Sequence, residues 1–135
     1  MENENQIQKK KDFSFRGMSL DELKKLEVRE FAKYLESRPR RSVLRNFQVV
    51  ENFLKLAKEK IEKGKKIRTH KRDIIIVPEM VGMKMQVYNG REFVQIEIIG
   101  EMLGHRLGEF ALTRSKVNHS KAGVGATKGS KAKAK

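Results

Sequence analysis

The dipeptide Asn89-Gly90 is the feature that most limits how this chain can fold. It lies between two runs in which apolar and polar residues alternate, and a two-residue hairpin turn needs positive φ angles that Asn and Gly tolerate best. With Tyr88 facing Arg91 across the turn, alternation places two sets of side chains on opposite faces. The apolar face carries Met83, Met85, Val87, Val94, Ile96 and Ile98, and the other face carries Lys84, Gln86, Tyr88, Arg91, Phe93, Gln95 and Glu97. The sequence therefore predicts an antiparallel hairpin with one buried face.

Two further elements are predicted around this hairpin. Ile74–Val77 is a β-branched run that ends at Pro78, as expected of a third strand. After the hairpin, Glu101–Leu107 has the length of a short helix, although Gly104 weakens it by roughly 1 kcal/mol relative to Ala. Residues 73–110 therefore predict a small, three-stranded, mainly antiparallel sheet followed by a short helix.

The segment before the sheet has the pattern of a helical pair. Ser19 and Glu22 have the spacing of a capping box, which satisfies backbone N–H groups at the start of a helix. Apolar residues at helical spacing follow until Pro39, which ends the first helix and suits the first turn of a second. The second helix is expected to end at Gly64. We therefore expect two helices packed as a hairpin against the sheet.

These elements define an α+β fold and three regions of the chain. Residues 1–12 have almost no apolar content and are expected to form a mobile arm. Residues 13–112 are expected to form one domain, with the helical pair in 19–63 and the sheet with its short helix in 73–110. Residues 113–135 contain no acidic residue and few large apolar ones, which predicts a basic tail that is disordered when free.

Charge is the strongest guide to what the chain binds. It contains 31 Lys and Arg against 17 Asp and Glu, with an isoelectric point near 10.1. Residues 38–72 carry 13 basic and three acidic side chains, and residues 113–135 carry seven basic and none acidic. Such a chain favours a polyanion, either nucleic acid or an anionic membrane surface. No apolar run is long enough to span a bilayer, no signal peptide is evident and there is no Cys, so a soluble intracellular protein is expected.

Two basic clusters are candidate binding sites. The first consists of Arg38, Arg40, Arg41 and Arg45, and the second of Lys63, Lys65, Lys66, Arg68, His70, Lys71 and Arg72. Guanidinium groups offer forked donors that match phosphate oxygens. The alternative for the first cluster is a solvated face paired with Glu residues, but acidic residues are scarce nearby. As a loop, the second cluster would repel itself without a negative partner, and an RNA backbone is the natural candidate.

The sequence offers little for catalysis or metal binding. None of the three histidines has a second His or Cys at ligand spacing. Glu101, His105 and Glu109 have the spacing of an acid–base or metal trio on a helix, but no nucleophile or further ligand accompanies them. The glycine-rich stretch 123–130 lacks the Gly-Lys-Ser/Thr order of a phosphate-binding loop. We therefore predict no enzyme, no cofactor and no metal, and we expect His105 and Arg106 to face phosphate.

Two aromatic residues on the polar face of the hairpin have two alternative roles. Tyr88 and Phe93 lie beside Lys84 and Arg91, where their rings would stack on bases. In the other interpretation the rings pack under the helical pair. Arg91, next to the turn, is the stronger candidate for contact with RNA.

Several motifs occur along the chain at fixed separations. In and after the predicted sheet they are Asn89-Gly90-Arg91, Ile98, Leu103-Gly104, Leu107-Gly108-Glu109-Phe110 and Thr113. This order resembles the signature of the small-ribosomal-subunit protein S-nineteen (S19) family. The segments Arg68–Asp73 and Pro78–Gly82 also resemble that family. Its long archaeal and eukaryotic form, whose eukaryotic member is called S-fifteen, is resembled by Phe13, Arg16-Gly17, Ser37-Arg38, Arg40-Arg41 and Gly123–Thr127.

The resemblance implies a structural role in the small ribosomal subunit of the cytoplasm. It implies binding to 16S-type ribosomal RNA in the subunit head near the decoding site, with protein S-thirteen as a neighbour and transfer RNA within reach of the C-terminal tail. Neither a membrane nor a small-molecule substrate is expected. The residues predicted to bind ribosomal RNA are Arg38, Arg40, Arg41, Arg45, Lys65, Lys66, Arg68, Thr69, His70, Lys71, Arg72, Lys84, Asn89, Arg91, His105, Arg106, Arg114, Lys116, His119 and Lys121.

Two other function classes are weighed against this one. A free-standing nucleic-acid-binding or chromatin-like protein would have the same charge, and composition does not separate it from a ribosomal protein. An RNA-processing enzyme would need a carboxylate cluster or a nucleophile with a base, and the sequence has neither.

Overall fold

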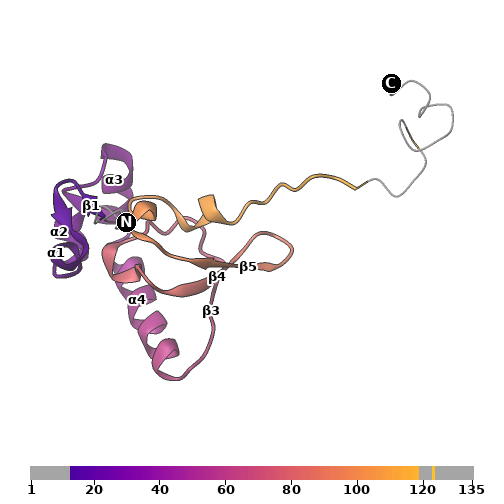
Figure 1. The fold of residues 1–135 in the computed structure, drawn as a ribbon, viewed down its shortest axis with the longest axis horizontal. Coiled ribbons are helices and arrows are strands. Elements are labelled where there is room, and N and C mark those ends of the chain that lie inside the picture. Colours follow the sequence, from indigo (N-terminus) through magenta and orange to yellow (C-terminus); the bar gives the residue numbers. More distant parts are fainter. Residues whose placement is uncertain (1–12, 119–122, 124–135) are drawn as a thin grey trace, which may run out of the picture.

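A computed structural model describes residues 13–118 and Gly123, and its architecture is α+β, as predicted (Figure 1). The helices are α1 (Leu20–Lys24), α2 (Val28–Ala32), α3 (Ser37–Arg45) and α4 (Phe47–Glu62). The strands are β1 (Ser14–Phe15), β2 (Met18–Ser19), β3 (Ile67–Thr69), β4 (Lys84–Tyr88) and β5 (Phe93–Glu97). The 3₁₀ helices are η1 (Pro78–Met80), η2 (Gly100–Met102) and η3 (Leu107–Phe110). None of the described helices is long and apolar enough to cross a membrane.

The N-terminal helical region begins as predicted and then divides. At the Ser19–Glu22 capping box, the Ser19 N–H donates to Glu22 Oε2 at 3.0 Å and the Glu22 N–H donates to Ser19 Oγ at 3.4 Å. The prediction of one long first helix is wrong, because a second capping box at Glu27 and Glu30 starts α2 after an extended residue. Each capping box satisfies the N–H groups of a new helix start, so two short helices form in place of one.

The predicted second helix also divides, at Asn46. This residue has φ −115° and ψ 23°, which are not helical values, and it separates α3 from α4. Pro39 lies in the first turn of α3 and Gly64 follows α4 with φ +63°, both as predicted. The helical pair is therefore corrected to four α-helices in the described part of the chain.

The main sheet has three strands, as predicted, but its third strand is a different segment. The strand order is β3-β4-β5, in which β4 and β5 are antiparallel and β3 runs parallel to β4. The sheet is therefore mixed rather than mainly antiparallel. The edge strand is Ile67–Thr69, whereas the predicted strand Ile74–Val77 lies outside the sheet and forms a bridge between Ile75 and Arg106.

Ile74–Val77 is instead a buried segment that pairs with the end of the folded chain. Its four side chains are at most 4% exposed. The Ile76 N–H donates to His105 O at 2.8 Å, and the Leu107 N–H donates to Ile74 O at 3.0 Å. A buried backbone must find hydrogen-bond partners, and these two segments supply them to each other.

The prediction of a short helix over 101–107 is wrong, because the backbone of this stretch pairs with Ile74–Val77. Gly104 has φ +81°, and its N–H donates to Ile76 O at 3.1 Å, so this stretch pairs with the buried segment. Glycine tolerates the positive φ that this turn requires. The helical character that remains is confined to η2 and η3 on either side of the turn.

The hairpin between β4 and β5 has the predicted faces and a different register. Tyr88 pairs with Phe93 rather than with Arg91, so four residues form the loop. The side-chain oxygen of Asn89 accepts the N–H groups of Arg91 at 2.9 Å and Glu92 at 2.8 Å, which closes this wider loop. Because the shift is an even number of residues, every side chain keeps its predicted face.

The hydrophobic core lies between the helices and the inner face of the sheet. The inner face contributes Ile67, Met85, Val87, Ile96 and Ile98. The helices contribute Leu23, Val28, Phe31, Ala32, Val43, Val50, Phe53, Leu54 and Ala57. Figure 1 shows α1–α3 gathered beyond one end of the sheet and the C-terminal segment leaving from the other. The inner face of the sheet therefore packs against the helices, and the outer face lies outside this core.

We expect Gly104→Ala to destabilise the fold more than Gly64→Ala. Both glycines have positive φ, so both substitutions carry the strain of a left-handed residue, about 1–2 kcal/mol. At Gly104 the new Cβ would also lie 3.0 Å from Leu35 Cδ2, whereas nothing lies within 4 Å at Gly64. Urea unfolding should therefore give a lower midpoint for the Gly104 variant, and equal midpoints would contradict this packing.

Candidate nucleic-acid interface

Alternation in β3 determines which side chains of the second basic cluster reach the outer face. Ile67 and Thr69 are buried, whereas Arg68 and His70 are exposed. Lys71 is also exposed, and its N–H donates to Thr69 Oγ1 at 3.0 Å. The buried Thr69 thus accepts a hydrogen bond from the backbone of the basic segment, whereas the side chains of Arg68 and His70 are exposed.

The outer face combines basic and aromatic side chains from three strands. Arg68 Nε donates to Gln86 Oε1 at 2.9 Å, and Arg68 Cζ lies 5.3 Å from the centroid of the Phe93 ring. The His70 ring centroid lies 4.6 Å from that of Tyr88 and 5.2 Å from that of Phe93. The interpretation in which Tyr88 and Phe93 pack under the helices is wrong, because both rings lie on this outer face and outside the core.

Other candidates are exposed at the edges of the sheet. Arg91 is exposed in the loop that the Asn89 side chain closes, and Lys65 and Lys66 are exposed between α4 and β3. Lys84 Nζ lies 3.8 Å from Glu97 Oε2, with both side chains more than 60% exposed. Such an exposed ion pair contributes only about 0–1 kcal/mol, so it does not hold Lys84 away from another partner.

Arg72 ends the second basic cluster but is directed into the protein. Its Nη1 donates to Tyr88 O at 2.6 Å, and its Nη2 donates to Gly108 O at 2.7 Å and Ala111 O at 2.5 Å. A Cβ at Gly108 would lie 2.9 Å from Arg72 Cβ, so glycine is needed for this close approach. Arg72 therefore joins the end of β4 to η3.

Two other candidate arginines also donate within the chain. Arg106 Nη1 donates to Asp73 O at 2.9 Å and its Nη2 donates to Ser42 Oγ at 3.0 Å, which links α3 to the start of the buried segment. Arg40 belongs to α3, but its guanidinium group reaches the C-terminal end of α2, where a cation is favoured. Its Nε and Nη2 donate, at 2.9–3.2 Å, to the carbonyl oxygens of Ala32, Lys33 and Leu35.

The remaining arginines of the first cluster are exposed. Arg38 and Arg41 line an open hollow with Ser37 at the start of α3. Arg45 is exposed one helical turn after Arg41. Arg40 is exposed as well, so the first cluster differs in its hydrogen bonds: Arg40 donates to the carbonyl groups at the end of α2, whereas no such bond is found for Arg38, Arg41 and Arg45 among the described residues.

His105 forms a local pair with a carboxylate. Its Nδ1 lies 2.8 Å from Glu109 Oε2, and its ring centroid lies 6.0 Å from that of Phe110. Glu101, His105 and Glu109 line one surface pocket. No group of three metal-binding side chains is found within the described residues.

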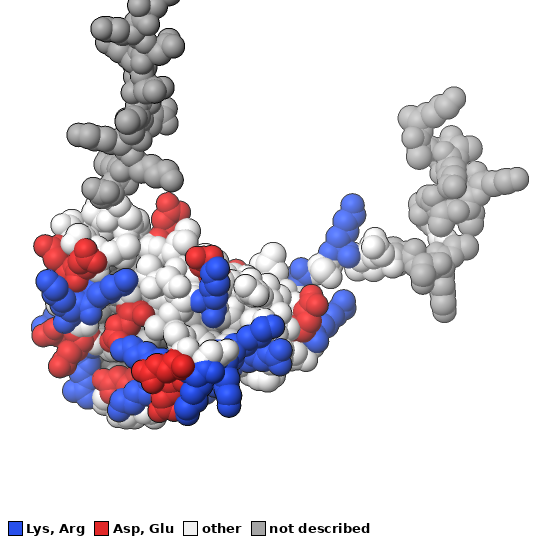
Figure 2. Space-filling model, turned by 60° about the horizontal axis from the view of Figure 1, so that its bottom comes forward, with Lys and Arg blue, Asp and Glu red and all other residues white. Residues whose placement is uncertain are grey.

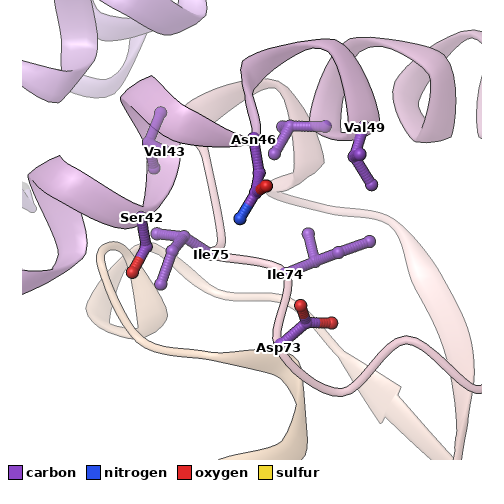
Figure 3. A pocket seen from close by; sticks show the side chains of 8 residues that line it. Ser42, Val43, Asn46, Val49, Asp73, Ile74 and Ile75 are labelled. Carbon is purple, nitrogen blue, oxygen red and sulfur yellow. The ribbon is translucent and has the colours of Figure 1, made fainter.

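A small pocket between α3, α4 and the buried segment had no signal in the sequence. Figure 3 shows the polar side chains of Ser42, Asn46 and Asp73 around it, with Ile74 and Ile75 as apolar walls. Its volume is about 80 Å³, below the roughly 300–1,000 Å³ of ligand-binding pockets. We assign it no ligand.

The C-terminal candidates are only partly described. Arg114 and Lys116 are exposed in the segment that leaves the body after η3 (Figure 1). His119 and Lys121 lie outside the described residues.

The chain is similar in sequence to known proteins of the small ribosomal subunit. A family model described as ribosomal protein S19 matches residues 39–119. The small ribosomal subunit protein uS19 of Methanospirillum hungatei JF-1 is 44% identical over 123 residues, which cover 91% of this chain and 88% of that protein. The protein of the same name from Methanocella arvoryzae is 46% identical over 123 residues, which cover 91% of this chain and 86% of that protein.

We expect Arg72→Lys to lower the free energy of unfolding by about 1–3 kcal/mol, because a single ammonium group cannot replace the fork that reaches three carbonyl groups. The matched control is Arg68→Lys on the exposed face, where the change should stay within about 0.5 kcal/mol. Urea unfolding measures both values. Equal losses in the two variants would show that Arg72 has no special structural role.

Proposed function

Because the chain belongs to the ribosomal protein S19 family, we propose that it is a structural constituent of the small ribosomal subunit that binds 16S-type ribosomal RNA in the subunit head, near the decoding site. The observation that carries this proposal is the 44% identity, over 91% of the chain, to a protein named for the small ribosomal subunit. The family is not a class of enzymes, and the proposed role includes no reaction. It takes place in the ribosomes of the cytoplasm.

The surface charge supports a polyanionic partner. Figure 2 shows Lys and Arg gathered on the half of this face from which the C-terminal segment leaves, while basic and acidic side chains are mixed on the other half. Phosphate contacts by such side chains position a protein on RNA, whereas folded shape and unpaired bases provide specificity. RNA lying against this half of the face would meet mainly basic side chains.

The exposed Lys and Arg candidates other than Arg40 are the proposed phosphate contacts. On the body of the protein they are Arg38, Arg41, Arg45, Lys65, Lys66, Arg68, Lys71, Lys84 and Arg91. We propose that Arg40, Arg72 and Arg106 act in holding the fold, because the guanidinium group of each donates to at least two groups elsewhere in this chain. Thr69 and Asn89 are proposed to shape the backbone beside the contacts.

The finer partners belong to the same proposal. Residues 13–112 would act as one RNA-binding unit, with protein S-thirteen as a neighbour in the head. Arg114, Lys116, His119 and Lys121 belong to the basic segment from Thr113 onward, which contains no acidic residue and suits contact with ribosomal RNA and transfer RNA. No membrane, cofactor or small-molecule substrate has a place in this role.

We expect the protein to bind a small-subunit head-domain RNA fragment more tightly than an unrelated structured RNA of equal length, and to keep this preference at high salt. Each phosphate contact should contribute about −0.7 to −0.9 to the slope of log affinity against log salt. Arg38→Gln and Arg41→Gln should each reduce the size of the slope by about 1, whereas Lys24→Gln on α1 should leave it unchanged. Equal binding to both RNAs, lost together as salt rises, would contradict the ribosomal assignment.

A further inference from the structure

Three aromatic rings from three different segments meet on the outer face of the sheet. His70 directly follows β3, Tyr88 ends β4 and Phe93 begins β5. The ring centroids lie 4.6 Å apart for His70 and Tyr88, and 5.2 Å apart for each of the other two pairs. We call these residues the ring cluster. It exists only because β3 runs parallel to β4, which brings position 70 beside position 88.

The ring cluster is not part of the core that holds the fold together. His70 is exposed, and Tyr88 and Phe93 are half-buried. The residues behind them on the inner face, Thr69 and Val87, are buried. The three rings are therefore partly accessible at the surface, where a partner can contact them.

The surroundings of the ring cluster favour RNA as its occupant. Arg68 Cζ lies 5.3 Å from the Phe93 centroid at one side, and Lys71 and Arg91 are exposed directly after His70 and in the β4–β5 loop. Glu92 in the same loop and Glu97 on the same face are acidic, and Glu97 lies 3.8 Å from Lys84. Aromatic rings offer π-faces to a nucleobase while the adjacent cations meet its phosphates.

An unpaired base suits this surface better than a duplex. In an A-form helix the bases are stacked inside and present only their edges, so protein rings on a flat sheet cannot reach their faces. A base that is splayed out can lie against a ring. We propose that His70, Tyr88 and Phe93 form a stacking platform for a single unpaired nucleobase, with Lys71 and Arg91 on its backbone. This inference rests on the proposed RNA-binding function and specifies which RNA structure the sheet recognises.

The chain allows a direct optical test of this platform. It contains two Tyr and no Trp, so Tyr34→Phe leaves Tyr88 as the only tyrosine fluorophore. In this variant, an eight-nucleotide oligouridylate should quench the Tyr88 emission, because a stacked base lies against the ring. An eight-base-pair RNA duplex should bind through its phosphates without quenching. Absence of quenching at saturating oligouridylate, or equal quenching by the duplex, would overturn the platform.

A second pair of variants separates ring stacking from phosphate contact. Tyr88→Leu should weaken binding of the oligouridylate roughly tenfold, whereas Tyr88→Phe, which keeps the ring, should bind like the parent. Both should keep the parent salt slope, because no charge is changed. Equal affinity of the Leu and Phe variants would also overturn the platform. Neither readout uses the head-domain fragment, so a failed platform leaves the proposed function standing, and a lost preference for that fragment counts against the proposed function alone.

Discussion

The backbone pairing between residues 72–76 and 104–108 is the interaction on which the rest of the structure depends. Ile74–Val77 is too buried for its peptide groups to reach water, so each must find a partner inside the protein. The returning chain supplies these partners through the N–H groups of Gly104, Leu107 and Gly108. This pairing joins the helical half to the far end of the folded chain. It also fixes where β3 and the β4–β5 hairpin lie, and so positions the outer face of the sheet.

The arginines divide between this internal framework and the surface. Arg72 and Arg106 lie at the edge of the backbone pairing and donate to groups 16 to 64 residues away in sequence. A guanidinium group suits this task because its planar fork can satisfy several carbonyl oxygens at once and stays charged. Other cations, such as Arg38, Arg41 and Arg68, are exposed at the surface. A high count of basic residues therefore overstates the number of groups available to RNA.

Features set by local chemistry could be predicted from the sequence. The Ser19–Glu22 capping box, the place of Pro39 and the faces of the hairpin depend on neighbouring residues, and the structure confirms them. The identity of the third strand could not be predicted, because Ile74–Val77 has strand propensity but finds its partners about 30 residues later. The same limit applies to the site. Its charge could be predicted, whereas the internal bonds of Arg72 and the meeting of His70 with Tyr88 depend on tertiary pairing.

Two kinds of arginine coexist in one basic surface: those that donate within the fold and those that are exposed. NMR of the arginine Nη–H groups in ¹⁵N-labelled protein, which are the groups that donate in Arg40, Arg72 and Arg106, is recorded with and without the head-domain RNA fragment. The signals of Arg40, Arg72 and Arg106 should be protected from solvent exchange in the free protein and should keep their positions when RNA is added. The signals of Arg38 and Arg41 should exchange rapidly in the free protein and shift on binding. Shifts of Arg72 and Arg106 as large as those of Arg38 and Arg41 would contradict the account.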